Sequence, residues 1–421
     1  MRFEAMHILV AEDHGFQRKA LVRTLNGLGA GRVSEAEDGV AALASMQADP
    51  ADVLILDLEM PGMDGMALIR HLAESGSRAK VLISSALDKA LLASVETMAR
   101  AYGVQLLGRV EKPVTPEKLR AIFGIDAPPA ASSGQAGIAG SAGGAGGAGG
   151  GRAGLPAAFG PDELRAAIER REFVAWYQPK ATLRDGQVVG VEALARWQHP
   201  QYGTLAPAVF IAGIERLGLI GELTWQVLDH TARSWRQWAL QGQILKVSVN
   251  LSLLALQEPG YAERLIAFLA ERSVDSRYII FEITESSDMA DVPHCLENLT
   301  RLRMHGFALS IDDYGTGYAS IQQLLRVPFS ELKIDRSFVA SAAQDETRLT
   351  VLASSLQLAQ RLGLEAVAEG VETAQDWALL ASLGCALAQG YLISRPQPAH
   401  AVGAAIARWD GDYARLSAAA A

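Results

Sequence analysis

Short apolar runs alternate with segments of helical periodicity through the first 125 residues of the chain. Continuous apolar runs bounded by turn residues are typical of buried strands, whereas apolar residues three and four positions apart are typical of amphipathic helices. Their alternation predicts an α/β domain with a doubly wound, five-stranded parallel sheet of flavodoxin-like type. The expected strands are His7–Ala11, Val33–Ala36, Val53–Leu56, Lys80–Ser84 and Val104–Leu107, and the expected helices are Phe16–Leu28, Val40–Gln47, Met66–Glu74, Leu91–Arg100 and Pro116–Ile122.

The same alternation returns after residue 158 and continues to about residue 412. A βα pattern of about 250 residues favours a (β/α)8 TIM barrel. The first two runs are joined by the short turn Arg184-Asp185-Gly186, a hairpin signal, so we expect a modified barrel with one antiparallel strand. The expected strands are Val174–Lys180, Val188–Trp197, Lys246–Leu251, Tyr278–Thr284, Phe307–Ile311, Glu331–Ile334, Leu364–Ala368 and Ala386–Tyr391, and the expected helices include Ala262–Glu271, His294–Met304 and Leu349–Leu362.

Residues 126–158 consist almost entirely of Gly, Ala, Ser and Pro. This segment has no apolar periodicity, which predicts a flexible linker rather than a core element. Its roughly 30 residues would hold the two ends ~30 Å apart on average. We therefore expect a domain at residues 1–125, a linker at 126–158 and a second domain at 159–412.

The composition narrows the class of partner. The 421 residues carry a net charge of −9, which argues against DNA as a partner because a phosphate backbone requires clustered Lys and Arg. The two cysteines, Cys295 and Cys385, lie far apart and are expected to be reduced thiols of a cytoplasmic protein. No apolar run approaches the ~20 residues of a membrane span, and we expect no signal peptide.

Three acidic residues, a hydroxyl and a lysine stand at the ends of strands in the first domain. Glu12 and Asp13 end the first strand, Asp57 ends the third, Ser85 follows the fourth and Lys112 follows the fifth. These strand ends converge in a doubly wound sheet, and three clustered carboxylates repel one another unless a cation such as Mg²⁺ lies among them. Asp57 is then a candidate phosphoryl acceptor, with Ser85 and Lys112 contacting the phosphoryl oxygens.

This domain resembles the receiver domain of two-component response regulators. The strings that carry the resemblance are Glu12-Asp13, Leu56-Asp57 with Met60-Pro61-Gly62-Met63-Asp64-Gly65, Ser85-Ala86 and Lys112-Pro113. The resemblance implies Mg²⁺-dependent phosphorylation of Asp57 by a histidine kinase or phosphotransfer protein; the alternative is a receiver fold that is never phosphorylated. Arg109 stands where many receivers have an aromatic switch residue, so relay through an aromatic side chain is in doubt.

Ligands suited to divalent cations stand at or near the ends of the expected barrel strands. Such groups from separate strands are hard to explain as solvated surface, because the strand ends of a barrel converge on one face. Carboxylate and amide oxygens suit hard cations, and a nearby lysine can offset the charge of a phosphate ester. The residues concerned are Glu192, Asn250, Glu282, Asp312, Asp313, Lys333 and Glu369.

Asp312 and Asp313 are adjacent, and neighbouring residues within a regular strand point to opposite faces. Both can face one site where the strand stops, and Gly315-Thr316-Gly317 indicates that the chain leaves the strand there. Two adjacent carboxylates are destabilising unless cations neutralise them. Asp312 is expected to bridge two ions, and Asp313 to ligate the second.

The remaining barrel candidates have distinct expected roles. Glu192 and Arg196 share one face of a strand, ~13 Å apart at ~3.3 Å per residue, so Glu192 can hold a metal while Arg196 contacts a distant part of an anionic ligand. The alternative is a buried ion pair between them. Lys333 is expected to orient a water or offset phosphate charge, and Glu369 to ligate the second metal or accept a proton from the attacking water. Glu285, past the end of its strand, is expected to hold a neighbouring loop.

The second domain resembles the EAL-domain family of cyclic di-GMP phosphodiesterases, over roughly residues 159–411. The strings that carry the resemblance are Tyr177-Gln178-Pro179, Glu192-Ala193-Leu194-Ala195-Arg196, Asn250-Leu251-Ser252, Glu282-Ile283-Thr284-Glu285, Asp312-Asp313-Tyr314-Gly315-Thr316-Gly317, Lys333-Ile334-Asp335-Arg336, Glu369-Gly370-Val371-Glu372 and Gln389-Gly390-Tyr391.

The resemblance implies hydrolysis of cyclic di-GMP to linear pGpG with two Mg²⁺ or Mn²⁺ ions in the barrel, besides one ion in the receiver. It assigns Glu192, Lys333 and Glu369 to catalysis. It also implies a homodimer formed through this domain; the alternatives are a non-catalytic cyclic di-GMP sensor or a scaffold. The implied first-metal ligands are Glu192, Asn250, Glu282 and Asp312; the implied second-metal ligands are Asp312, Asp313 and Glu369; the implied substrate contacts are Gln178, Leu194, Arg196 and Gln389; Glu285, Glu372 and the loop 313–318 are the implied dimer-coupling elements.

Overall fold

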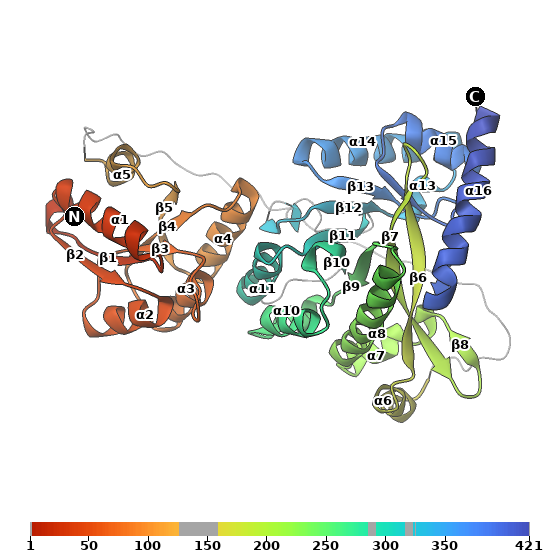
Figure 1. Ribbon diagram of the computed structural model, residues 1–421, viewed down its shortest axis with the longest axis horizontal. Helices are drawn as coiled ribbons and strands as arrows, with labels where there is room; N and C mark the ends of the chain where they lie inside the picture. Colours follow the sequence, from red (N-terminus) through yellow and green to blue (C-terminus); the bar gives the residue numbers. More distant parts are fainter. Residues whose placement is uncertain (1, 126–158, 285–291, 316–322, 325, 421) are drawn as a thin grey trace. The chain divides into compact units, whose positions relative to one another are not determined.

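The computed structural model describes residues 2–125, 159–284, 292–315, 323–324, 326–420. The chain divides into two compact units, one containing strands β1–β5 and the other strands β6–β15 (Figure 1). The expected linker at residues 126–158 lies outside the described residues.

The first unit is built on a five-stranded sheet in the order β2-β1-β3-β4-β5, with every neighbouring pair parallel. This confirms the prediction of a doubly wound parallel sheet. The strands are β1 (His7–Ala11), β2 (Arg32–Ala36), β3 (Val53–Asp57), β4 (Lys80–Ser85) and β5 (Gln105–Glu111), and the helices are η1 (Phe3–Ala5), α1 (Gly15–Gly27), α2 (Gly39–Ala48), α3 (Gly65–Glu74), α4 (Lys89–Ala101) and α5 (Pro116–Phe123).

Local sequence explains where these elements begin and end. Asp38, Asp64 and Thr115 each accept a hydrogen bond from a backbone N–H in the first turn of the helix that follows, as N-cap residues do. The last strand of this sheet is longer than the sequence pattern predicted. β5 continues to Glu111 through an irregularity at Gly108, whose φ of 149° places the backbone outside the range of ordinary strands.

The second unit is a barrel of eight strands, closed where β6 pairs with β7 (Figure 1). Around the barrel the order is β6-β14-β13-β12-β11-β10-β9-β7. The barrel strands are β6 (Phe173–Thr182), β7 (Val188–His199), β9 (Lys246–Asn250), β10 (Ile279–Thr284), β11 (Ala308–Tyr314), β12 (Glu331–Ile334), β13 (Glu365–Ala368) and β14 (Leu387–Gln389), and the added strands are β8 (Gly203–Leu205) and β15 (Gln397–Pro398).

One barrel strand runs against the others. β6 is antiparallel to both of its barrel neighbours, β7 and β14, whereas the other neighbouring barrel pairs are parallel. The prediction of a modified barrel with one antiparallel strand is therefore confirmed. The helices of this unit are α6 (Pro161–Glu169), η2 (Pro207–Val209), α7 (Ile211–Arg216), α8 (Ile220–Leu240), α9 (Leu253–Leu256), α10 (Tyr261–Glu271), η3 (Ser276–Tyr278), α11 (Val292–Met304), α13 (Arg336–Val339), η4 (Ala342–Gln344), α14 (Glu346–Leu362), α15 (Ala374–Ser382), η5 (Ala399–Ala401) and α16 (Val402–Ala420).

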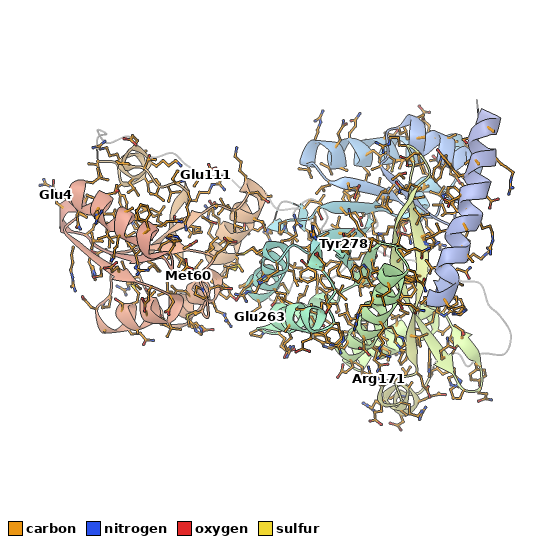
Figure 2. All side chains as sticks on the ribbon, in the orientation of Figure 1. Glu4, Met60, Glu111, Arg171, Glu263 and Tyr278 are labelled. Atoms are coloured by element: carbon orange, nitrogen blue, oxygen red, sulfur yellow. The ribbon has the colours of Figure 1, made fainter. Side chains whose placement is uncertain are left out.

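The C-terminal helix α16 fixes the turn between β6 and β7. The buried Trp409 donates a hydrogen bond from Nε1 to the carbonyl oxygen of Gly186, at 2.7 Å. Gly186 has a φ of 70°, and a Cβ atom there would lie 2.4–2.6 Å from the ring of Tyr413. The turn therefore requires glycine both for its backbone conformation and for the close approach of the helix. Side chains of this unit are drawn as sticks in Figure 2.

Candidate functional site

Three carboxylates meet at the carboxyl edge of the first sheet. Glu12, Asp13 and Asp57 each offer an oxygen atom, and these atoms lie within 4.8 Å of one another. Lys112 Nζ lies 2.6 Å from Asp57 Oδ2 and 2.8 Å from Glu12 Oε2. Ser85 is buried at the end of β4, and its Oγ accepts a hydrogen bond from Leu87 N at 3.1 Å. The structure thus brings Glu12, Asp13, Asp57 and Lys112 together and places Ser85 at the end of the neighbouring strand β4.

The charges of this cluster favour the binding of a cation. Burial raises the pKa of Glu12, against the attraction of Lys112. Burial opposes the charge of Lys112, but its hydrogen bonds with Asp57 and Glu12 hold its pKa above the ordinary value. One ammonium group faces three carboxylates, so a divalent ion fits the excess negative charge.

Arg18 was not predicted from sequence. Its Nη1 atom donates to the backbone carbonyl oxygens of Glu12, at 2.7 Å, and Asp13, at 3.3 Å, while its Nε lies 3.3 Å from Glu35 Oε2. These bonds hold the segment that carries two of the three carboxylates. An arginine on the first turn of the following helix gave no distinctive signal in the sequence.

In the second unit, the expected metal ligands form two overlapping groups of three carboxylates. Glu192, Glu282 and Asp312 form one group, and Asp312, Asp313 and Glu369 form the other, each with oxygen atoms within 4.8 Å of one another. Asn250 lies in register with Glu282 on the neighbouring strand. Its amide nitrogen donates to Glu192 Oε1 at 3.3 Å, so its carbonyl oxygen remains as the possible ligand.

Lys333 lies at the centre of these groups. Its Nζ atom is 2.7 Å from Asp312 Oδ1, 2.7 Å from Glu369 Oε1, 3.1 Å from Glu282 Oε2 and 3.6 Å from Glu192 Oε2. The side chain is 1% exposed. Burial alone would lower the pKa of this lysine, but the surrounding carboxylates raise it well above its ordinary value, so the ammonium form persists.

Asp312 and Asp313 face one site for a reason that the sequence prediction missed. Strand β11 does not stop before them but continues to Tyr314, through an irregularity at which these two residues lie opposite the single residue Lys333. This is the arrangement of a β-bulge. Asp313 has a φ of 55°, a left-handed conformation that Asp tolerates better than most residues. The bulge therefore turns both carboxylates to the same side.

Burial and neighbouring charges shift the pKa values of four carboxylates of this cluster in different directions. Burial and neighbouring carboxylates raise the pKa of Glu192 to about 7, of Glu369 to about 8 and of Asp313 to about 6. Burial has the same tendency at Glu282, but the attraction of Lys180 and Lys333 lowers its pKa to about 2. The two lysines therefore favour the ionised form of Glu282, whereas burial and repulsion favour the protonated forms of Glu192, Asp313 and Glu369.

The charge of the barrel cluster fits two divalent cations. Five carboxylates pair with the ammonium groups of Lys180 and Lys333, and Asp313 lies beside two of them, so the cluster has an excess of four negative charges when all six are ionised. The five are Glu192, Glu282, Asp312, Glu331 and Glu369. Glu282 Oε2 is buried and, although 3.1 Å from Lys333 Nζ, makes no well-directed hydrogen bond. Oxygen ligands in excess charge are the donor set that Mg²⁺ and Mn²⁺ prefer.

A cavity of about 270 Å³ opens beside these carboxylates. Of the expected substrate contacts, Gln178, Leu194 and Gln389 line it. Arg196 does not; its guanidinium lies 5.8 Å from the centre of the Trp176 ring, and burial lowers its pKa. No ion pair joins Arg196 to Glu192 in the described part of the chain. The lining also includes residues without an expected substrate role: Arg336, Gly370, Gly390 and Tyr391.

An amide relay, also unpredicted, orients Glu192. Gln389 Nε2 donates to Glu192 Oε2 and, at 3.2 Å, to Gln178 Oε1. Gln178 Nε2 in turn donates to the carbonyl oxygen of Ser394 at 3.1 Å. Gln389 Oε1 is buried without a hydrogen-bond partner. The relay fixes one carboxylate of the first group and leaves an acceptor beside the cavity.

The residues expected to couple dimerisation to the site are incompletely described. Glu285 and residues 316–318 of the loop 313–318 lie outside the described residues. Glu372 is exposed and lines the cavity. No helix among the described residues has the length and apolarity needed to cross a membrane.

The fold and the two acidic sites define a receiver domain joined to an EAL domain. The model of the response regulator receiver domain matches residues 8–123, and that of the EAL domain matches residues 162–396. The chain belongs to the EAL domain family. It is similar to RocR of Pseudomonas aeruginosa, a cyclic di-GMP phosphodiesterase, at 35% identity over 400 residues, which cover 93% of this chain and 96% of RocR.

Two further similarities cover the barrel. MucR of Pseudomonas aeruginosa, a bifunctional diguanylate cyclase/cyclic di-GMP phosphodiesterase, is 41% identical over 246 residues, 58% of this chain and 36% of MucR. The solved structure of the PaMucR phosphodiesterase in complex with c-di-GMP matches with a TM-score of 0.54 and 40% identity, covering 57% of this chain and 98% of that chain.

Proposed function

We propose that this protein is a phosphodiesterase that hydrolyses cyclic di-GMP to linear pGpG with two divalent cations. The observation that carries the proposal is the pair of carboxylate groups that share Asp312 in the barrel. The relatives RocR and MucR are named for this activity, and RocR matches over nearly its whole length. The proposed cations are Mg²⁺ or Mn²⁺, two in the barrel and one in the receiver.

Each barrel residue has a defined task in this proposal. Glu192, Asn250, Glu282 and Asp312 hold the first cation, and Asp312, Asp313 and Glu369 hold the second. When bound, the cations supply Lewis acidity and stabilise the attacking and leaving oxygens of an in-line displacement. Lys333 keeps its proton and offsets charge on the phosphate, and Glu369 accepts the proton of the attacking water. Glu369 accepts this proton only in its ionised form, which a divalent cation bound beside it would favour.

The substrate is proposed to lie over the cavity beside these ligands. Gln178, Leu194 and Gln389 contact it from the cavity wall, and the unpartnered Oε1 of Gln389 can accept one of its hydrogen bonds. Arg196 contacts a part of the substrate farther from the reacting phosphate, because its guanidinium is a fixed cation outside the cavity lining.

The receiver is proposed to regulate the barrel. Asp57 accepts a phosphoryl group from a histidine kinase or phosphotransfer protein with Mg²⁺ bound to Glu12, Asp13 and Asp57, and Ser85 and Lys112 contact the phosphoryl oxygens. The receiver would occupy residues 1–125 and the EAL domain residues 159–412, joined by the linker at 126–158. Coupling passes through a homodimer in which Glu285 and Glu372 take part, rather than through an aromatic side chain at position 109.

Incubation of the purified chain with cyclic di-GMP and Mn²⁺, followed by chromatography, tests the activity. We expect linear pGpG from the wild type and none above background from Glu192→Ala. Glu59→Gln, a charge change on an exposed residue of the receiver, is the matched control and should leave turnover unchanged. Tight binding of cyclic di-GMP without product would instead support a sensor, and a full cellular effect from Glu192→Ala would support a scaffold.

A further inference from the structure

A second layer of polar side chains lies directly beneath the proposed metal ligands. Four barrel strands each contribute one residue to the upper layer and, two positions away, one residue to the lower layer, since alternate strand residues share a face. β6 runs antiparallel, so its order is reversed. The upper members are Gln178, Asn250, Asp312 and Lys333, and the lower members are Lys180, Ser248, Ser310 and Glu331.

Lys180 is the centre of the lower layer. Its Nζ atom lies 2.7 Å from Ser248 Oγ, 2.9 Å from Glu282 Oε1 and 3.2 Å from Glu331 Oε1. The three partners come from three other strands, and Lys180 and its partners are each at most 2% exposed. The ammonium group is therefore buried with three polar partners around it.

Glu282 joins the two layers. Its Oε1 accepts the hydrogen bond from Lys180, while its Oε2 lies 3.1 Å from Lys333 without a well-directed hydrogen bond. One oxygen is thus held from below, and the other lies beside the ammonium group of Lys333, which also contacts Glu192 and Asp312, the other carboxylates of its group. A carboxylate held in this way cannot rotate to place both oxygens in the lower layer.

We propose that Lys180 is a positioning residue for the first cation site: it fixes Glu282 through Oε1 so that Oε2 faces the cation, and Glu331 balances its charge. The proposal rests on the proposed function only in requiring that the barrel binds a divalent cation. Metal ligands are commonly oriented by a hydrogen-bonded partner behind them, and loss of such a partner typically weakens metal binding 10–100-fold.

A positioning role and a purely charge-balancing role for Lys180 predict opposite changes in cation affinity when the lysine is removed. An ammonium group a few ångströms from a cation site repels the cation, so its removal should tighten cation binding if charge alone matters. If Lys180 acts by orienting Glu282, its removal should weaken binding despite the lost repulsion. The two roles are separated by the direction of the change in Mn²⁺ affinity.

The test measures Mn²⁺ binding to the full chain by electron paramagnetic resonance of free Mn²⁺, after chelation and dialysis. All proteins carry Asp57→Asn to weaken the receiver site. The variants are Lys180→Met, Glu331→Gln, the double variant Lys180→Met/Glu331→Gln and Ser248→Ala. Lys246→Met is the matched control, because Lys246 lies on the same strand as Ser248, is half-exposed and approaches Glu365 no closer than 3.9 Å.

We expect the double variant, which buries no unpaired charge, to bind Mn²⁺ about 10–100-fold more weakly, and Ser248→Ala to show a smaller loss in the same direction. Glu331→Gln and Lys246→Met should bind as the parent does. Lys180→Met leaves Glu331 buried and unpaired, so if it does not fold, the double variant and Ser248→Ala decide the question. The role of Lys180 would be overturned if the folded double variant bound Mn²⁺ as tightly as the parent or more tightly. If the double variant does not fold, the same result with Ser248→Ala would overturn it. Absence of Mn²⁺ binding by the parent would overturn the proposed metal site itself.

Discussion

Asp312 Oδ1 and Lys333 Nζ lie 2.7 Å apart across the β-bulge of β11. This contact lies where the two carboxylate groups of the barrel overlap, because Asp312 belongs to both. The bulge places Asp313 beside it on the same side. One local irregularity in one strand therefore determines whether the barrel has one acidic group or two.

The number of cations bound by the chain follows from this overlap. Three groups of carboxylates predict about three Mn²⁺ ions per chain at saturation. We expect Asp57→Asn to lower this number by one and Asp312→Ala to lower it by two, because Asp312 is shared. Equilibrium dialysis with metal analysis measures the numbers, and loss of only one ion in Asp312→Ala would contradict the shared ligand.

The conformation of Asp313 predicts different effects for two substitutions. Asn tolerates a φ of 55°, so Asp313→Asn should keep the bulge and the stability but lower turnover of cyclic di-GMP roughly 100-fold through loss of a ligand charge. A β-branched residue is poorly compatible with this conformation, so Asp313→Val should also lower the free energy of unfolding by about 2 kcal/mol. Thermal unfolding and turnover, measured on both variants, check the pair. Equal stability of the two would show that the bulge does not depend on residue 313.

The architecture could be predicted from sequence because buried parallel strands leave continuous apolar runs separated by helical patterns. The antiparallel strand could also be predicted, since a short turn such as Arg184-Asp185-Gly186 is a hairpin signal. The bulge was not, because it is a property of the pairing of Asp312 and Asp313 with Lys333 on another strand. Pairing registers depend on neighbours that one segment does not specify.

The candidate metal ligands could be predicted from the sequence, but the groups that hold them in place could not. A carboxylate at a strand end has a recognisable pattern. Lys180, within an apolar run, fits the pattern of an exposed lysine at a strand edge as well as that of a buried one. Its burial follows from contacts with Ser248, Glu282 and Glu331, which come from three other strands. Such convergence appears only once the barrel is closed.

Helix α16 packs against the β6–β7 turn, so replacing a glycine by alanine should lower stability more in this turn than elsewhere. Gly186 and Gly203 have similar φ values, 70° and 68°, so both substitutions should carry the cost of a left-handed alanine, about 1 kcal/mol. Only at Gly186 would the added methyl meet another side chain, the ring of Tyr413. We therefore expect Gly186→Ala to lower the unfolding temperature several degrees more than Gly203→Ala. Equal losses, measured by calorimetry, would mean that the helix shifts to accommodate the methyl group.

The ion pairs of Asp229 should make the free energy of unfolding depend on pH. Arg171, Arg233 and Arg272 all pair with this nearly buried carboxylate. Burial tends to raise its pKa, but the charges and hydrogen bonds of Arg233 and Arg272 lower it below the ordinary value. A carboxyl whose pKa is lower in the folded than in the unfolded chain stabilises the fold above the unfolded pKa of about 4, and this contribution disappears as the pH falls through the folded pKa.

Asp229→Asn should therefore lower the free energy of unfolding by about 2 kcal/mol at pH 7, the usual contribution of hydrogen bonds to a charged group. The difference from wild type should shrink steadily as the pH falls below about 4, because wild-type Asp229 then becomes neutral as well. Denaturant unfolding at a series of pH values measures this difference. Asp412→Asn is the matched control: Asp412 pairs with Arg415 on the surface of α16, where an ion pair contributes about 0–1 kcal/mol. A difference between wild type and Asp229→Asn that stays constant with pH would show that Asp229 acts through its shape rather than its charge.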